Sequence, residues 1–505
     1  MSKIIIYRKI YIALLCLLAV SLTTSNFFMN LAWVLLLVVW VVEGGWREKW
    51  SRLRQSPLLQ FFLLLFAVHL VAMLWTSNWH YGLFDIQKKL PLLAVPLVVL
   101  TSKPLSTKDL RPVLILYVAA VFVVTVIGWV RFFLFPELPY RDLIPYISHI
   151  RFSLNVCLVI VLLFNVLYKY LTAHSAKRTV ICLLSIVCLL DILWFMAFLL
   201  LIRSYTAMAV LAVLLLVAAL LQVRKRWWPI ALCAVCLSAF GFYAWHLVDD
   251  YYGECDRTGP LVENGRYVYD DFDIDAIRDA WPRYSHYPID SVNPHGYSIE
   301  WTALRYLNSL GLPKDDQGLA QLAPNDFRNI EQGIANVIYT QPLRLRSMAY
   351  TLLFEYENYR CSQYFGESSA LQRVALWRAA CRVFLDHPLF GVGTGDAVDA
   401  CHEQLRLSQS SIADTDKHPH NQYLSLLAAF GLVGFIIPIL PFFVSRSHSR
   451  GKAGRLFVLY LTIVLISFLT EDTLETLAGV MFVAFFTSLF VYTTPNQALN
   501  PPKME

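Results

Sequence analysis

The stretch HPHNQYLSLLAAFGLVG, residues 418–434, joins the two kinds of sequence from which the chain is built. Its histidines close a long polar segment at 248–419, and the remainder opens an apolar run at 421–444. That run is long enough to cross the ~30 Å hydrocarbon core of a membrane as a helix. Two imidazoles at a membrane surface, beside a long loop, indicate chemistry on a lipid-linked substrate.

Apolar runs of this kind recur about twelve times, and 57% of the 505 residues are hydrophobic, which is typical of polytopic membrane proteins. We therefore predict an all-α polytopic integral membrane protein with about 12 transmembrane helices. The run at 89–101 is short and contains two prolines, which favours a kinked or re-entrant segment. The runs lie at 4–22, 27–43, 58–75, 89–101, 112–135, 150–168, 179–201, 206–222, 227–247, 421–444, 455–470 and 474–493.

Three parts follow from this spacing. We predict an N-terminal transmembrane block of about nine helices at 1–247, a loop domain at 248–419 and a C-terminal block of about three helices at 420–505. A loop of that length is usually functional. Its tryptophans and tyrosines, with helix-like stretches near 299–310, 325–337, 343–358 and 370–386, predict a compact, mainly helical domain before the last three helices.

The distribution of charge gives an orientation. The segment 248–419 holds 25 of the 36 acidic residues but 15 of the 42 basic ones. Of the 27 basic residues elsewhere, 21 fall in cytoplasmic segments when the N-terminus is placed inside. We therefore predict cytoplasmic N- and C-termini and a segment 248–419 that lies outside. The net charge of +6 then reflects orientation, so the expected partners include membrane lipids and no nucleic acid.

Four cysteines lie in the loop: Cys255, Cys361, Cys381 and Cys401. An oxidising periplasm would permit them to pair, with three connectivities, and the sequence alone chooses none of them. It does not determine the oligomeric state either. No cysteine, histidine and carboxylate set has metal-ligand spacing, so we expect no metal and no cofactor.

His420 is the candidate catalytic residue. A neutral imidazole takes a proton from a sugar hydroxyl as that hydroxyl attacks, and the ordinary pKa of histidine suits this role. His418 and Asn421 are supporting candidates beside it. A structural histidine at the start of a helix is the equally weighted alternative.

Three arginines near the predicted outer face are candidates to bind pyrophosphate: Arg151, Arg203 and Arg373. An arginine near hydrocarbon usually has an anionic partner, and its planar guanidinium suits bidentate phosphate binding. The alternative for each is an interfacial side chain that reaches lipid head groups. Glu471, Asp472 and Glu475, between the last two runs, are candidates to position an arginine or to line a cavity, or else are solvated. The segment FGVGTGD at 390–396 has no strand context, so we interpret it as a tight turn.

These residues also resemble a known family. HNQYL at 420–424 with GLVG at 431–434 is similar to the signature of the O-antigen ligase/polymerase superfamily, and Arg373 with DHPLFGVGTG at 386–395 is similar to the segment before it. The resemblance extends to HIRFS at 149–153 and TEDTLE at 470–475, and residues 305–336 resemble a long-loop variant common in Bacteroidetes-type bacteria.

The resemblance implies an inverting, metal-independent glycosyltransferase in the inner membrane of a bacterium, with its large loop in the periplasm. The donor would be a glycan on undecaprenyl pyrophosphate, and the acceptor a hydroxyl of lipid A-core or of another glycan. His420 would be the base, Arg373 the main pyrophosphate binder, and Arg151 and Arg203 supporting binders. One departure concerns RSYT at 203–206, where family members often have Ser-Arg, which puts Arg203 in doubt.

An O-antigen ligase is the expected function. The nearest alternative is a repeat-unit polymerase of the same superfamily, and the two differ in an acceptor that one sequence does not identify. A transporter is a remote alternative, because only Asp191 lies in the middle of an apolar run and the two halves are unequal.

Overall fold

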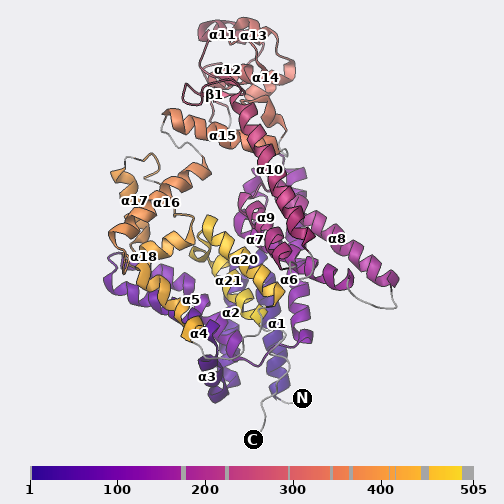
Figure 1. Cartoon of the computed structure of the whole chain (residues 1–505), viewed down its shortest axis with the longest axis vertical. Helices are drawn as coiled ribbons and strands as arrows, with labels where there is room; N and C mark the ends of the chain where they lie inside the picture. The colour runs from indigo at the N-terminus through magenta and orange to yellow at the C-terminus, as the bar shows by residue number, and fades with distance from the viewer. Residues whose placement is uncertain are drawn as a thin grey trace. The chain divides into compact units, whose positions relative to one another are not determined.

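The computed structural model describes residues 3–171, 178–221, 227–293, 296–341, 345–362, 368–408, 410–413, 415, 417–444 and 454–491 (Figure 1). Over these residues the chain is almost entirely helical, with one hairpin of β1 (Val262–Glu263) and β2 (Arg266–Tyr267). Its contacts group the residues into two units. The first contains 1–230 and 375–505, and the second contains 231–374.

The first unit is built from helices throughout. Two of them, α10 and α16, run across its boundary with the second unit. The helices are α1 (Lys3–Thr24), α2 (Asn26–Glu43), α3 (Trp46–Gln55), α4 (Pro57–Val71), η1 (Ala72–Trp75), α5 (Trp79–Thr101), α6 (Thr107–Leu134), η2 (Tyr140–Asp142), α7 (His149–Leu171), α8 (Arg178–Leu201), α9 (Tyr205–Leu220), α10 (Trp228–Tyr252), α16 (Ser369–Asp386), α17 (Ala397–Leu407), α18 (Gln422–Ile436), η5 (Ile437–Ile439), α19 (Leu440–Val444), α20 (Arg455–Thr470), η6 (Thr473–Glu475) and α21 (Leu477–Phe490).

The predicted fold class is confirmed. Each apolar run coincides with one helix or with consecutive helical segments. Among the described residues, seven helices are long and apolar enough to cross a membrane, and α9, α20 and α21 are shorter apolar helices. The run at 89–101 is the second half of the 23-residue helix α5, which begins ten residues earlier, at Trp79, and contains Pro91 and Pro96.

The helix α21 lies at the centre of the first unit. It packs against α5, α7 and α20 (Figure 1), and every residue from Gly479 to Phe490 is buried. A helix that is apolar on all sides is stable only when neighbours surround it. The ring of Phe486 contacts those of Tyr117 and Tyr460, and so ties α21 to α6 and α20. The segment before α21, which carries the polar residues described below, is therefore anchored in the core.

A backbone insertion interrupts α18. At Gly431 the helix has φ 60° and ψ −167°, and residues 388–393 lie against the break. Val392 and Gly393 donate to the carbonyls of Ala428 and Ala429, at 3.0 and 2.9 Å. In return, the nitrogens of Leu432 and Val433 donate to the carbonyls of Pro388 and Leu389, at 2.9 and 3.1 Å. The inserted segment thus replaces hydrogen bonds that the broken helix cannot make for itself.

Only glycine fits this crossing of two backbones. A Cβ on Gly391 would lie 2.4 Å from the backbone of Ala429, and one on Gly431 would lie 2.3 Å from that of Leu389. Both residues also have positive φ, which side chains disfavour. The glycines in 386–395 and 431–434 therefore join the segment before α17 to the helix that follows His420.

The second unit has a helical core of its own. Its remaining elements are α11 (Ile274–Ala280), η3 (Trp281–Arg283), α12 (Ile299–Leu310), α13 (Asp316–Ala320), α14 (Pro324–Glu331), η4 (Val337–Thr340) and α15 (Leu345–Ser362). Trp281, Tyr306 and Phe327 are buried together there. The predicted helix at 299–310 is α12, whereas the one at 325–337 ends at Glu331 because Gly333 has φ 80°.

Candidate functional site

The two histidines lie on the short segment that leads into α18. His420 has φ 52°, a conformation that is uncommon for a residue with a side chain. The next residue, Asn421, is the N-cap of α18, and its side-chain oxygen accepts from the nitrogen of Leu424 at 3.2 Å. The sequence thus begins a helix one residue after a strained turn, and the turn holds the imidazole of His420 outside the helix.

Asp472 holds this turn in place. Its carboxylate accepts from the backbone nitrogens of His420 and Asn421, at 2.5 and 3.0 Å, and from the hydroxyl of Ser425 at 2.7 Å. Asp472 is buried. Burial raises its pKa above the ordinary value of 3.8, and Glu475 adds to that effect, whereas the Ser425 hydrogen bond opposes it. The carboxylate of Asp472 thus contacts the backbone of His420 and Asn421.

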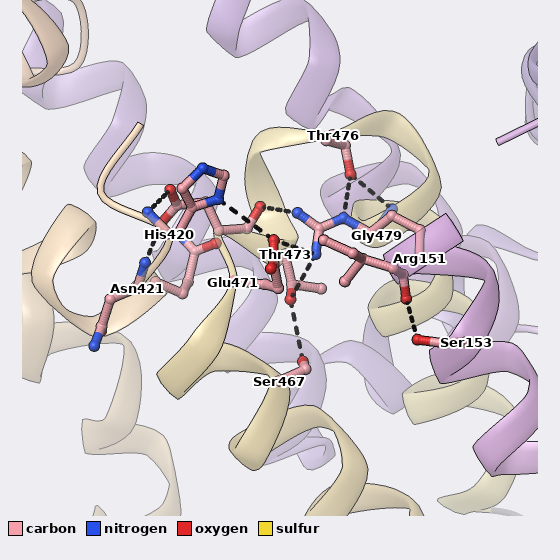
Figure 2. Close-up of polar contacts among 12 residues, drawn as sticks. Arg151, Ser153, His420, Asn421, Ser467, Glu471, Thr473, Thr476 and Gly479 are labelled. Atoms are coloured by element: carbon pink, nitrogen blue, oxygen red, sulfur yellow. Dashed lines mark hydrogen bonds and ion pairs between the residues drawn. The ribbon is translucent and has the colours of Figure 1, made fainter. Parts of the chain in front are cut away.

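Glu471 connects the imidazole to an arginine. Figure 2 shows His420 and Arg151 approaching this carboxylate from two sides. Its Oε2 lies 3.5 Å from Nδ1 of His420 and 3.7 Å from NH1 of Arg151. The Glu471 side chain is only 3% exposed, whereas that of His420 is 33% exposed, so the carboxylate supports the ring from behind.

Arg151 fixes the segment between α20 and α21. Its Nε donates to the hydroxyl of Thr476 at 3.1 Å, and its NH2 donates to the carbonyl of Asp472 at 2.7 Å (Figure 2). A longer bond of 3.5 Å reaches the hydroxyl of Thr473. The two threonines were not among the predicted site residues, and their place directly after Glu471 and Asp472 is the signal that could have found them. Arg151 is 7% exposed, so these contacts enclose it.

The other two arginines lie elsewhere. Arg203 has φ 48° in the turn before α9, and its guanidinium lies 5.4 Å from the ring centre of Tyr140. The adjacent Ser204 donates to Ser153 at 2.9 Å, which connects this turn to the helix of Arg151. Arg373 lies on α16 within the second unit, whereas the histidines belong to the first.

A second polar cluster lies beside the first, and the prediction from sequence named only Glu475 among its members. Nζ of Lys89 is 2.6 Å from Oδ2 of Asp85 and 3.0 Å from both carboxylate oxygens of Glu475. Asp85 and Lys89 are one helical turn apart on α5, a spacing that favours ion pairs and could have indicated them. Gln422 joins the cluster to α18, because its Nε2 donates to Glu475 at 3.3 Å.

This second cluster forms one side of a small pocket with a cavity volume of ≈ 30 Å³. Tyr81, Asp85, Lys89 and Glu475 line it together with His418, whereas the lining does not include His420. Burial lowers the pKa of His418 below its ordinary value of 6.5, and Glu475 and Asp472 oppose this only in part. The His418 ring is therefore neutral at pH 7.

Glu475 has the opposite environment. Burial opposes ionisation of its carboxyl, but the Lys89 ammonium outweighs burial and holds its pKa well below the ordinary value of 4.5. Glu475 is thus an anion that shares Lys89 with Asp85.

Two further predictions concern metals and cysteines. Within the described ranges, no group of three or more histidine, cysteine, aspartate or glutamate side chains could hold a metal ion. Cys255, Cys361, Cys381 and Cys401 are free thiols, so none of the three possible pairings is formed.

Comparison with known proteins identifies one part of the chain. The family model of the O-antigen ligase matches residues 337–439, which run from η4 through α16, the inserted segment 388–393, α17 and α18 to the end of η5. The matched region contains Arg373, His418 and His420. No curated protein matches the chain.

Proposed function

We propose that this chain is an inner-membrane glycosyltransferase of the O-antigen ligase type, because the O-antigen ligase family model matches its residues 337–439. It would transfer a glycan from undecaprenyl pyrophosphate to a hydroxyl of lipid A-core, with inversion and without a metal ion. The bias of basic residues toward the predicted cytoplasmic segments supports a site on the periplasmic side.

One observation carries the proposal: the imidazole of His420 is paired with a buried carboxylate and still reaches solvent. Nδ1 of its ring lies 3.5 Å from Glu471, whose carboxylate favours the tautomer with the proton on Nδ1. Nε2 then keeps its lone pair for the hydroxyl of the acceptor. A hydroxyl nucleophile is generally activated by a base that another side chain orients, and here Glu471 orients His420.

The reaction follows from that geometry. As the acceptor oxygen forms its bond to the anomeric carbon, Nε2 of His420 takes the hydroxyl proton, and Glu471 stabilises the imidazolium. The bond between the anomeric carbon and the phosphate oxygen breaks on the opposite face, and its electron pair leaves with the pyrophosphate. One displacement inverts the anomeric carbon, and the proton on His420 returns to solvent.

Arginine would bind the departing pyrophosphate. We assign this role first to Arg373, which lies in the matched region, with Arg203 as a supporting binder. The contacts of Arg151 point to a different contribution, because its guanidinium is directed at Glu471 and the segment 472–476. Its role in the proposal is to position the carboxylate that orients His420.

A deletion strain tests the function. Without the ligase, full-length glycan should accumulate on undecaprenyl pyrophosphate while lipid A-core remains bare, and the wild-type gene should restore transfer. Accumulation of lipid A-core that carries a single repeat unit would instead identify a polymerase. An unchanged glycan profile would rule out both.

A further inference from the structure

The short helix α3 exposes its tryptophans and buries a lysine. Trp46 and Trp50 are 53% and 54% exposed, whereas Lys49 is only 5% exposed. In water this arrangement is unfavourable, because an indole ring is stabilised by burial and an ammonium group by hydration. The outer surface of α3 therefore calls for an environment other than bulk water.

Polar contacts fix which side of α3 meets the rest of the first unit. Nζ of Lys49 donates to the carbonyl of Trp40 at 2.6 Å and lies 3.1 Å from Oε2 of Glu43, so it ties α3 to α2. The guanidinium of Arg52 donates to the carbonyl of Thr101 at 2.7 Å, at the end of α5. Because both contacts hold one side of the helix, α3 cannot rotate to bury its tryptophans.

The outer surface of α3 divides into two faces. The Trp/Arg face consists of the exposed side chains Trp46, Arg47, Trp50 and Arg54. The polar face consists of the exposed side chains Glu48, Ser51 and Gln55. At 3.6 residues per turn, the members of the Trp/Arg face fall within an arc of about 100°, and the polar face lies outside that arc. One face is therefore aromatic and cationic, and the other is suited to water.

The position of α3 in the chain brings it to a membrane surface. Its neighbours α2, and α4 together with η1, are each long and apolar enough to cross a membrane. Only Gly44 and Gly45, both with positive φ, separate α3 from α2, and only Ser56 separates it from α4 (Figure 1). A ten-residue helix between two such spans lies at the level of the lipid head groups, where tryptophan is enriched.

The two arginines of the Trp/Arg face are available to an anion. Within the part of the chain that the structure describes, neither guanidinium donates a hydrogen bond or forms an ion pair, and that of Arg54 lies 5.0 Å from the ring centre of Trp50. Arg47 and Arg54 are separated by about two helical turns, so their charges point to the same side. A guanidinium suits phosphate oxygens, and this face carries no acidic residue to repel them.

We infer that the Trp/Arg face of α3 docks on the head groups of anionic phospholipids. Trp46 and Trp50 lie at the boundary between head groups and acyl chains, and Arg47 and Arg54 each bind a lipid phosphate. An interfacial helix of this kind is held by its apolar side chains together with the attraction of its basic residues to anionic lipid. The docking holds the turn between two membrane spans at the surface, and it does not depend on the proposed glycosyl transfer.

Photolabelling of the full-length chain in phosphatidylcholine nanodiscs tests the docking. The probes are phosphatidylglycerol and phosphatidylcholine, each with a diazirine at the top of one acyl chain, and mass spectrometry locates the labelled residues. Two arginines that each favour anionic lipid about 5-fold predict that phosphatidylglycerol labels α3 about 10- to 30-fold more than phosphatidylcholine does. The label should lie on the Trp/Arg face and spare the polar face.

The double variant Arg47→Gln/Arg54→Gln should reduce that ratio to about 1. The control Arg283→Gln/Arg328→Gln removes two exposed arginines of the second unit, and therefore the same net charge, and should keep the wild-type ratio. Both double variants should give the wild-type yield of monodisperse protein, since the altered side chains are exposed.

Three results would overturn the inference. A wild-type chain with no label on α3, or with label confined to the polar face, would show that the Trp/Arg face does not meet lipid. Equal labelling by the two lipids would show that this face meets the membrane without recognising anionic head groups. A ratio that persists in Arg47→Gln/Arg54→Gln would remove the two arginines from the lipid site.

Discussion

Asp472 Oδ2 lies 2.5 Å from the backbone nitrogen of His420, so a carboxylate from the segment before α21 fixes the turn before α18. A residue with positive φ costs ~1–3 kcal/mol unless its surroundings stabilise it. The hydrogen bonds from His420 and Asn421 to one carboxylate offset that cost. The position of the imidazole therefore depends on a residue 52 positions later in the chain.

Asp472→Ala should abolish most transfer although residue 472 is not proposed to touch the substrate. The substitution removes three accepted hydrogen bonds, each worth about 1.5–3 kcal/mol when the acceptor is charged. The turn should then relax to negative φ and carry the imidazole away from Glu471. Complementation of a deletion strain measures transfer, with expression matched by immunoblot. Glu403→Ala, an exposed acid on α17, should complement fully, and equal activity of the two variants would contradict the role of Asp472.

His420→Ala should reduce transfer by ~10²–10⁴-fold, the usual contribution of a general base. The protein should still insert and bind donor. His418→Ala should be milder, because Glu471 pairs with the ring of His420. Measuring kcat for glycan transfer in both variants shows which histidine is the base. Loss of kcat in His418→Ala with normal kcat in His420→Ala would identify His418 as the base.

Arg373→Ala should weaken donor use by charge-assisted bonds worth ~1.5–3 kcal/mol each. Arg373→Lys should restore little, because an ammonium cannot make the planar bidentate contact of a guanidinium. The donor concentration dependence of transfer is the measurement. Arg378→Ala, an exposed arginine five residues later on α16, is the matched control. Normal donor use by Arg373→Ala at normal expression would remove Arg373 from the site.

Gly391→Ala and Gly431→Ala should each prevent stable folding. Each new Cβ would meet backbone atoms at 2.4 or 2.3 Å, and each position has positive φ, so neither chain can move aside cheaply. The yield of monodisperse protein after detergent extraction measures the effect. Gly241→Ala is the control, because it lies in α10 with nothing within 4 Å of the added Cβ and should not reduce the yield. Normal yields for both site variants would contradict the crossing of the two backbones.

The stability of the folded protein should depend on pH through Glu475. Its pKa is depressed in the folded state, so its stabilising contribution is present above about pH 4.5 and is lost as the pH falls below that value. Asp472 has a raised pKa, so its effect on stability has the opposite pH dependence. The effect of Glu475 is therefore isolated by comparing the wild type with Glu475→Gln. The unfolding temperature in detergent should differ between them at about pH 6 and converge toward about pH 3. A difference that does not change with pH would show that Glu475 contributes no ionic stabilisation.

The helices and the place of the histidines could be predicted from the sequence because their causes are local. Hydrophobic runs predict helices wherever a membrane must be crossed, and no distant contact is needed to recognise them. The caps are local too, since Asn421 bonds to the nitrogen three residues later. The two histidines lie where an apolar run begins, and a hydropathy profile of the sequence locates that position.

The glycines show where local patterns stop being sufficient. The segment 390–396 is interpretable from sequence as a tight turn, and Gly391 indeed has positive φ. Nothing local indicates that this turn fills a break at Gly431, forty residues later. That pairing exists because two backbones exchange hydrogen bonds after α18 is broken.

The roles of the site residues depended on tertiary structure. Arg151 was predicted to bind phosphate, and its observed partners are residues 471–476, more than three hundred positions away. Lys89 meets Glu475 across 386 positions, and no periodicity connects them. Hydropathy determines which segments are helices, because it acts along the chain. Which charged side chains pair is decided only when α21 packs against α5 and α7. A buried charge is costly unless it is paired, and the partners available to it are the side chains of the adjacent helices.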